Sequence, residues 1–247
     1  MVNYARLSGK WKQFLALTGF TLEEFLALLP AFQKCFQKYV EIDTLEGKKR
    51  QKRLYVDYAN SPVRTIEGKL LFILIYLRKA TTQDIFGEVF EMPQPVANKW
   101  IHILHACLNQ AMAAVGEKPV RSAQKLELEP EKGRATFLPG WHGTAHQRPK
   151  DPEIQGIFYS GKNKRHCVKN NVPVNRKVKI ILLTPTCEGT KHDRKIADET
   201  GLVLPEGSSL AQDTGFQGFA METCCGLHNF RLNFRPWHYN ADSIKPG

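Results

Sequence analysis

The chain has 247 residues, of which 42% are hydrophobic and 24% are charged, values that are ordinary for a globular protein in solution. That length suffices for one large domain or for two smaller domains, each with its own core. The net charge of +11 is unusual and favours a polyanionic partner, either nucleic acid or an acidic membrane surface. The longest apolar run, Leu70–Leu77, is far shorter than a membrane span, so we expect a chain that does not cross a membrane.

Six cysteines are spread along the chain without the spacing of a disulfide framework or a CxxC pair. Free thiols in a reducing cytoplasm are therefore predicted. The segment Met1–Lys12 lacks the apolar run of a signal peptide, so we expect no export. Four residues near the C-terminus suggest a zinc site, Cys224, Cys225, His228 and His238. Adjacent cysteines do not match the usual spacing of zinc ligands, so no zinc is predicted.

Residues 1–120 are rich in Leu, Phe, Ala, Lys and Gln at helical spacing. The first helix is predicted to begin near Thr21, because Thr21 and Glu24 form the sequence of a capping box. Five apolar residues then fall on one face of this helix, Phe25, Leu28, Leu29, Phe32 and Phe36. The basic run Lys48–Arg53 that follows is either a solvated loop or a contact for phosphate groups.

Three further helices are predicted before residue 120. They cover Arg64–Lys79, a segment capped by Thr81 or Thr82 that runs to about Phe90, and a segment from Pro95 to about Val115. The last two are separated by a short break that contains proline, which is the layout of a helix-turn-helix unit. Its second helix would present four polar residues outward, Gln94, Asn98, Lys99 and His102, and such side chains can read base edges in the major groove.

The second half of the chain differs from the first in residue composition. The polar stretch Arg121–Gly133 is the predicted junction, and residues 130–220 carry Gly, Pro and short β-branched runs. Predicted strands cover 134–138, 165–174, 178–184 and 209–212, with a helix at 191–200 between the last two. This order predicts an α/β domain built on a mixed sheet.

Several motifs in this half occur in the order found in one family. They are Gln147–Pro152, Tyr159–His166, Lys169-Asn170, His192–Asp198, Leu204–Ser208 and Gln212–Phe219. Together they resemble the DDE transposases of bacterial insertion sequences, in the large group related to eukaryotic Harbinger elements. The N-terminal helices resemble the helix-turn-helix domain that precedes the catalytic domain in this group, so the resemblance covers about residues 14–219.

The resemblance implies an RNase H-like catalytic domain with three carboxylates that hold Mg²⁺ or Mn²⁺. Two metal ions about 4 Å apart would activate the nucleophile and neutralise charge on the reacting oxygens, and Mg²⁺ prefers oxygen ligands. Asp213 matches the second carboxylate. Asp193 and Asp198 lie in a family pattern on the predicted helix, where both are explained as helix-end charges. Asp193 alternatively lies near the metal site and is then a catalytic candidate. The first Asp of the family's Asp-Gly-Thr sequence is matched by His142, a poor ligand for Mg²⁺.

The third carboxylate of the family is a Glu on a C-terminal helix, in a sequence like Glu-His-x-x-Gly, and no match to it is identified. Glu222 is considered too close in the chain to Asp213 to take this role. The stretch Ala220–Gly247 is predicted to lack helical periodicity, which indicates a frameshift and an early stop. We therefore expect a chain that does not cleave DNA.

The fold class expected is an α+β chain in two parts, an all-α helix-turn-helix domain and an incomplete RNase H-like mixed α/β domain. The predicted boundaries are 1–120, 121–219 and a non-family tail at 220–247. The expected partner is double-stranded DNA at transposon terminal repeats, in the bacterial nucleoid, with assembly into a homo-oligomer also compatible. Four basic residues, Lys162, Lys164, Arg165 and Lys169, form either a solvated hairpin or a clamp for the DNA backbone.

Three functional hypotheses remain open on the sequence. The chain is a DDE transposase, a non-cutting remnant that only recognises transposon ends, or a decayed gene product that folds poorly. The last follows from an RNase H-like sheet without its C-terminal helix, which would expose apolar surface.

Overall fold

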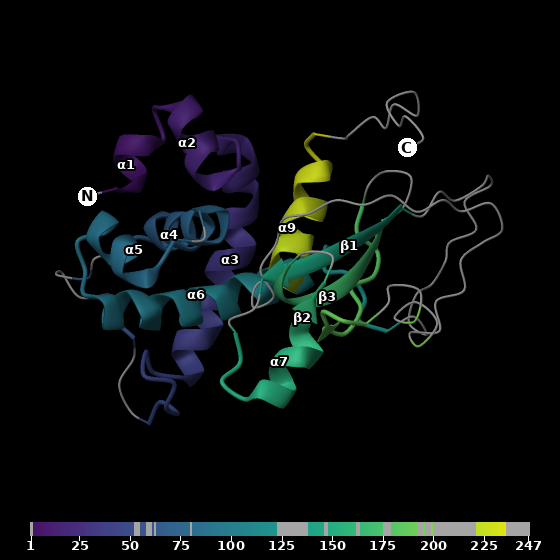
Figure 1. The fold of residues 1–247 in the computed structure, drawn as a ribbon. Helices are drawn as coiled ribbons and strands as arrows, with labels where there is room; N and C mark the ends of the chain where they lie inside the picture. The colour runs from purple at the N-terminus through teal and green to yellow at the C-terminus, as the bar shows by residue number, and fades with distance from the viewer. Residues whose placement is uncertain are drawn as a thin grey trace. The chain divides into compact units, whose positions relative to one another are not determined.

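The computed structural model describes residues 2–51, 55–57, 61, 63–79, 81–122, 138–145, 148–161, 164–174, 179–191, 195, 199 and 221–235. The chain divides into two compact units, Met1–Glu117 and Lys118–Gly247. The described part of the first unit is helical, apart from one isolated β-bridge, and that of the second combines helices with a small antiparallel sheet (Figure 1). The chain is therefore an α+β protein.

Six helices build the described part of the first unit. They are α1 (Tyr4–Leu7), α2 (Trp11–Thr18), α3 (Leu22–Ile42), α4 (Ile66–Lys79), α5 (Gln83–Val89) and α6 (Gln94–Ala114). The prediction that helical structure begins near Thr21 was wrong, since α1 and α2 precede that residue. α1 spans about one turn, and α2 buries only Phe14 and Thr18, so neither carries the apolar repeat of a longer helix. α1 begins at Asn3, whose side chain accepts a hydrogen bond from the Arg6 amide at 2.9 Å.

The capping box at the start of α3 is confirmed. The Glu24 amide donates to Thr21 Oγ1 at 3.2 Å, and the Thr21 amide donates to Glu24 Oε2 at 2.7 Å. Four of the five apolar residues predicted on one face of this helix are buried, Phe25, Leu28, Phe32 and Phe36, and Leu29 is half-buried. These reciprocal bonds satisfy two amides that the first turn of a helix otherwise leaves without partners.

The core of the first unit forms around α4, which contacts α2, α3 and α6. Residues Leu70–Ile75 of α4 are all buried. Phe72 of α4 meets Phe86 and Phe90 edge-on, with ring centroids 4.7 and 4.8 Å apart, and thereby packs α4 against α5. Edge-to-face packing of this kind adds to the stabilisation from burial alone.

A buried lysine lies in this core. Lys69 is only 1% exposed, and its Nζ donates to Asp57 Oδ1 at 2.8 Å and to the Arg64 carbonyl oxygen at 2.7 Å. The same ammonium group lies over the rings of Phe36 and Trp100, 5.1 and 5.7 Å from their centroids. Burial lowers the pKa of Lys69, and the bond to Asp57 counteracts this shift.

The described part of the second unit contains β1 (Leu138–Ala145), α7 (Pro152–Phe158), β2 (Tyr159–Ser160), β3 (Arg165–Val174), β4 (Cys187–Glu188) and α9 (Met221–Leu232). β3 has the predicted bounds, lies between β1 and β2, and also pairs with β4. The named strands pair antiparallel throughout, and a parallel pairing occurs among the described residues only at the bridge between Val120 and Leu182. The mixed sheet that we predicted is therefore not what these strands form.

The predicted strand at 178–184 forms only two isolated bridges within its described part, Ile180 with Val174 and Leu182 with Val120. Two hydrogen bonds form the bridge to Val120. Val120 donates to the Ile181 carbonyl oxygen at 3.1 Å and accepts from the Leu183 amide at 3.0 Å. The segment is extended, as its composition predicts, but it does not join a regular ladder. The predicted strands at 134–138 and 209–212 and the helix at 191–200 lie outside the described residues, apart from Leu138, Lys191, Lys195 and Glu199.

The prediction that residues 220–247 lack helical structure was wrong for the described part, because α9 begins at Met221. Met221 and Cys225 of α9 pack with Ile180 and Leu183 in one apolar cluster, which Val172 and Val174 of β3 extend. α9 thus covers apolar surface beside the sheet (Figure 1). The expectation of an open sheet without its C-terminal helix does not hold for these strands.

Asn229 fixes α9 to the extended segment. Its Nδ2 donates to the Ile180 carbonyl oxygen at 2.8 Å, and its Oδ1 accepts from the Ile180 amide at 2.7 Å. Asn229 is fully buried. One side-chain amide therefore satisfies both backbone groups of Ile180, as a neighbouring strand would do.

All six cysteines are free thiols. Burial raises the pKa of Cys107 and of Cys225 to about 12, so both remain protonated near neutral pH. Among the described residues, no single helix combines the length and apolarity needed to cross a bilayer; α2 and α3 reach it only as a pair bent by 54°.

Candidate functional site

The turn between α5 and α6 is tight. Residues Phe90–Pro93 connect the two helices. The Met92 amide donates to the Gly87 carbonyl oxygen at 3.0 Å, and a Cβ at Gly87 would lie 2.6 Å from the Met92 carbonyl oxygen. Glu91 has a left-handed backbone with φ of 53°. The turn therefore requires glycine at 87 and a positive φ at 91, and it holds α5 against α6.

The strained residue in this turn gives a first prediction. Replacing Glu91 with glycine is expected to raise the free energy of unfolding of the first unit by about 0.5 kcal/mol, because glycine adopts a positive φ without steric cost. Glu88, an exposed residue inside α5, is the matched control, since glycine there should lower stability by about 1 kcal/mol. Thermal unfolding of the two variants measures these shifts, and a loss of stability in both would contradict the prediction.

Three side-chain amides form a chain across the start of α5 and α6. Gln94 Nε2 donates to Gln83 Oε1 at 2.7 Å, and Gln83 Nε2 donates to Asn98 Oδ1 at 3.2 Å. Gln83 and Gln94 are the first residues of their helices, and Asn98 lies one turn further along α6. All three are half-buried. The predicted residues Gln94 and Asn98 are thus brought together through Gln83.

Lys99, also predicted on this face, pairs with an acidic residue of the loop that follows α3. Its Nζ lies 2.8 Å from Glu46 Oε1. The hydrogen bond to Lys99 lowers the pKa of Glu46, so this carboxylate stays ionised near neutral pH. An anionic ligand that binds Lys99 therefore has to compete with the carboxylate of Glu46.

The loop itself belongs to the basic run. Arg50 donates from Nε to the Val40 carbonyl oxygen at 2.6 Å and from an Nη to the Asp43 carbonyl oxygen at 3.1 Å, which closes the loop on the end of α3. Lys48 and Lys49 are exposed, and Lys49 pairs with Asp43 at 2.9 Å. Lys52 and Arg53 lie outside the described residues. Arg50 therefore has a structural role, whereas Lys48 and Lys49 are exposed. Contact of this run with phosphate groups stays a prediction.

His102 is exposed one turn beyond Asn98. Gln94, Asn98 and His102 follow one another at intervals of four residues, so they line one stripe of α6. Gln83 and Glu46 were not predicted as part of this face. Their residue types carry no periodic signal, and their contacts depend on how α5 and the loop pack against α6.

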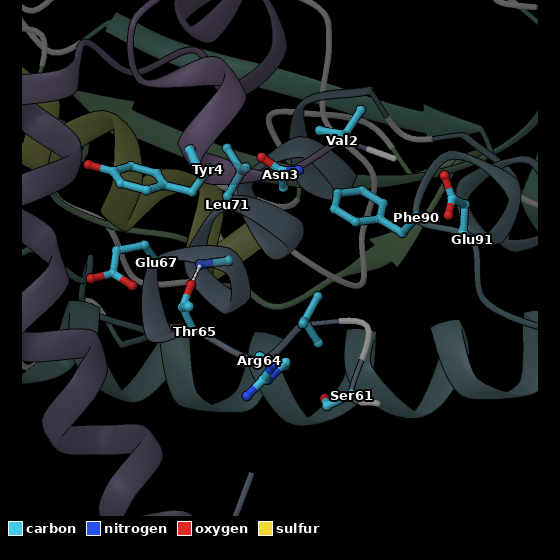
Figure 2. Close-up of a pocket in the computed structure, with 13 residues that line it drawn as sticks. Val2, Asn3, Tyr4, Ser61, Arg64, Thr65, Glu67, Leu71, Phe90 and Glu91 are labelled. Atoms are coloured by element: carbon cyan, nitrogen blue, oxygen red, sulfur yellow. Dashed lines mark hydrogen bonds between the residues drawn. The ribbon is translucent and has the colours of Figure 1, made fainter. Parts of the chain in front are cut away.

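A separate pocket of about 730 Å³ lies in the first unit between α1, the start of α4 and the turn after α5 (Figure 2). Tyr4, Leu71 and Phe90 give it an apolar lining, and Arg64 and Glu67 add charge. It contains none of the residues predicted for binding, and it touches the turn only at Phe90 and Glu91.

The basic residues predicted in the second unit divide between two environments. Lys164 and Arg165 are exposed at the start of β3, and Lys164 has a left-handed backbone with φ of 51°. Lys169 is half-buried, and its Nζ donates to the Lys191 carbonyl oxygen at 2.9 Å. Lys162 lies outside the described residues. Lys164 and Arg165 are therefore the described part of this group that faces solvent.

His142 lies in β1 and pairs in register with Asn170 of β3. Asn170 is buried, and its Nδ2 donates to the Thr184 carbonyl oxygen and to Thr186 Oγ1, both at 3.0 Å. Asp193 and Asp213, the predicted catalytic carboxylates, lie outside the described residues. Within the described ranges, no group of three or more His, Cys, Asp or Glu side chains is arranged to hold a metal ion.

Glu222 lies in the first turn of α9, and its Oε1 is 3.1 Å from Lys118 Nζ. Gly226 follows it by four residues, which is the spacing of Glu and Gly in the pattern expected around the third carboxylate; Thr223 stands where that pattern has His. The short distance in sequence between Glu222 and Asp213 had argued against this role for Glu222. A helix does begin at that point, and Glu222 lies on it.

Residues 140–228 match the family model described as DDE superfamily endonuclease. The match supports an endonuclease of the DDE transposase type in the second unit. It contains His142, Asp213 and Glu222, and it extends to residue 228, nine positions beyond Phe219. No curated protein and no solved structure matches the chain significantly.

Proposed function

We propose that this chain is a DNA-binding protein of the DDE transposase type that does not cut DNA. The first unit recognises double-stranded DNA at the ends of a bacterial insertion sequence related to the Harbinger group. The second unit is an RNase H-like endonuclease domain without cleavage activity. The observation that carries the proposal is the DDE endonuclease match at 140–228, together with His142 where the family has its first carboxylate.

The structure of the first unit supports a helix-turn-helix. α5 and α6 are joined by a tight turn, and α6 presents a stripe of amides and a histidine, with Lys99 beside it. Helices of this kind dock with their N-terminal residues in the major groove, where Asn, Gln and Lys recognise base edges. The net charge of +11 supports attraction to the phosphate backbone.

The residues present do not fit the two Mg²⁺ or Mn²⁺ ions that the family uses. Mg²⁺ prefers carboxylate oxygens, whereas His142 offers a nitrogen and removes one negative charge. Glu222 is paired with the ammonium group of Lys118, which offsets its charge. We therefore derive no step of phosphodiester cleavage through a metal in this chain.

The test measures binding and nicking by the full chain. Fluorescence anisotropy with labelled duplex DNA should show binding that weakens as salt rises, and supercoiled plasmid with Mg²⁺ or Mn²⁺ should remain intact. Metal-dependent nicking that disappears in Asp213→Ala would contradict the inactive site. Absence of binding at low salt would contradict the assignment to a DNA-binding protein.

Glu46 gives a second prediction, on affinity. Glu46→Gln removes the carboxylate beside Lys99, so duplex DNA should bind several-fold more tightly. The slope of log Kd against log salt should steepen by about one unit, which corresponds to one additional phosphate contact. Glu41→Gln, an exposed residue of α3, changes the net charge equally and is the matched control. An equal gain in both variants would show that net charge alone, and not release of Lys99, accounts for the effect.

A further inference from the structure

We propose that Gln83 determines the base preference of this protein by fixing the side-chain amides of Gln94 and Asn98. The inference rests on the proposed function and goes further, since it assigns a role in specificity to a residue that itself reads no base. It predicts recognition of one adenine by Gln94 and of a second adenine by Asn98, about two base pairs away.

The chain of amides has a direction. Gln94 donates to Gln83 at 2.7 Å, and Gln83 in turn donates to Asn98 at 3.2 Å. A side-chain amide is symmetric in shape but not in hydrogen bonding, because one end donates and the other accepts. Since Gln83 accepts from one neighbour and donates to the other, it orients both of them.

The atoms left over define what each amide can recognise. Gln94 has used one of its two N–H groups, so it keeps one donor and its Oε1 acceptor. That pair complements the N7 acceptor and N6 donor of adenine. Asn98 accepts one hydrogen bond at Oδ1, so it keeps a second lone pair on that oxygen and both N–H groups. It too can complement the N7 acceptor and N6 donor of adenine.

The spacing fits the groove. Asn98 lies four residues after Gln94, which corresponds to about 6 Å along the axis of α6. Neighbouring base pairs are roughly 3.4 Å apart, so the two amides face positions about two base pairs apart. Half-buried amides in a fixed orientation lose less freedom on binding than solvated ones, so the network is preorganised for recognition.

The experiment selects sequences from a duplex DNA library with a randomised 20-base-pair core, using the full chain. The wild type should enrich two adenines about two positions apart. Gln83→Met keeps the shape of the side chain and removes its hydrogen bonds, so both preferences should fall about tenfold while salt-dependent binding persists. Gln110→Met, at an exposed residue of α6, is the matched control and should leave both preferences unchanged.

Gln83→Glu separates positioning from a merely structural role. The carboxylate still accepts from Gln94 but cannot donate to Asn98. The adenine preference at the Gln94 position should therefore survive and that at the Asn98 position should be lost, whereas loss of α5–α6 packing would remove both together.

The outcomes separate a failure of the proposed function from a failure of the role of Gln83. If the full chain binds no duplex DNA, the proposed function fails and this inference fails with it. If the chain binds but Gln83→Met retains the wild-type preferences, only the role of Gln83 is overturned. If Gln83→Glu loses both preferences equally, the directional reading of the amides is overturned.

Discussion

Replacing Asn229 with alanine is expected to lower the free energy of unfolding of the second unit by about 2–4 kcal/mol. The substitution leaves the amide and the carbonyl oxygen of Ile180 buried without their partner, and each such group costs about 1–3 kcal/mol. Asn229→Asp should be at least as damaging, because a carboxylate cannot donate to Ile180 and would be charged in a fully buried position.

Hydrogen-exchange mass spectrometry in rising urea measures this effect segment by segment. Peptides from 179–184 and 221–232 should lose protection in Asn229→Ala, while peptides from α3 and α4 should not change. Asn233→Ala, at an exposed position just after α9, is the matched control. Unchanged protection at 179–184 in Asn229→Ala would show that this amide does not hold α9 in place.

Removing Asp57 should have the largest effect in the first unit. Asp57→Ala leaves the ammonium group of Lys69, which is 1% exposed, with the Arg64 carbonyl oxygen and two aromatic faces as its remaining partners. A buried charge that loses its counter-ion typically destabilises a protein by about 3–5 kcal/mol. Because Asp57 is itself 37% exposed and the rings partly compensate, we expect about 2–3 kcal/mol.

Lys69→Met removes the other member of the ion pair and is compared with Asp57→Ala. Methionine fills similar space without a charge, and the partly exposed carboxylate left at Asp57 remains hydrated. The loss should therefore be smaller, about 1 kcal/mol or less. Urea titrations followed by hydrogen exchange in α4 and α6 compare the two variants. A larger loss in Lys69→Met would mean that the ion pair stabilises the core more than an apolar side chain does.

Much of the first unit could be predicted because its signals are local. The capping box of Thr21 and Glu24 locates the start of α3, and proline near the start of α6 marks a helix boundary. The same locality predicted the outward stripe of Gln94, Asn98 and His102. Gln83 and Glu46 were missed because an amide or a carboxylate acquires its role only from the partner that packing brings to it.

The second unit was harder to predict because polar residues carry part of its packing. Thr223 and Asn229 are buried in α9, and Gly226 is buried beside them. These residues interrupt the apolar period by which a helix is recognised in a sequence. The segment at 179–184 has the composition of a strand, yet its partners are Asn229, Val120 and Val174, whose positions no local pattern reveals.

The bond between Ile180 and Asn229 also orders events during synthesis. It joins residues 49 positions apart, so the chain must close a long loop before the apolar cluster of the second unit is complete. A ribosome releases the chain from its N-terminus at roughly 5–20 residues per second. The helices of the first unit therefore have all their partners while α9 is still inside the ribosome. Until Asn229 has left the ribosome, the nascent chain has a complete first unit, and the strands of its second unit still expose the apolar side chains that α9 later covers.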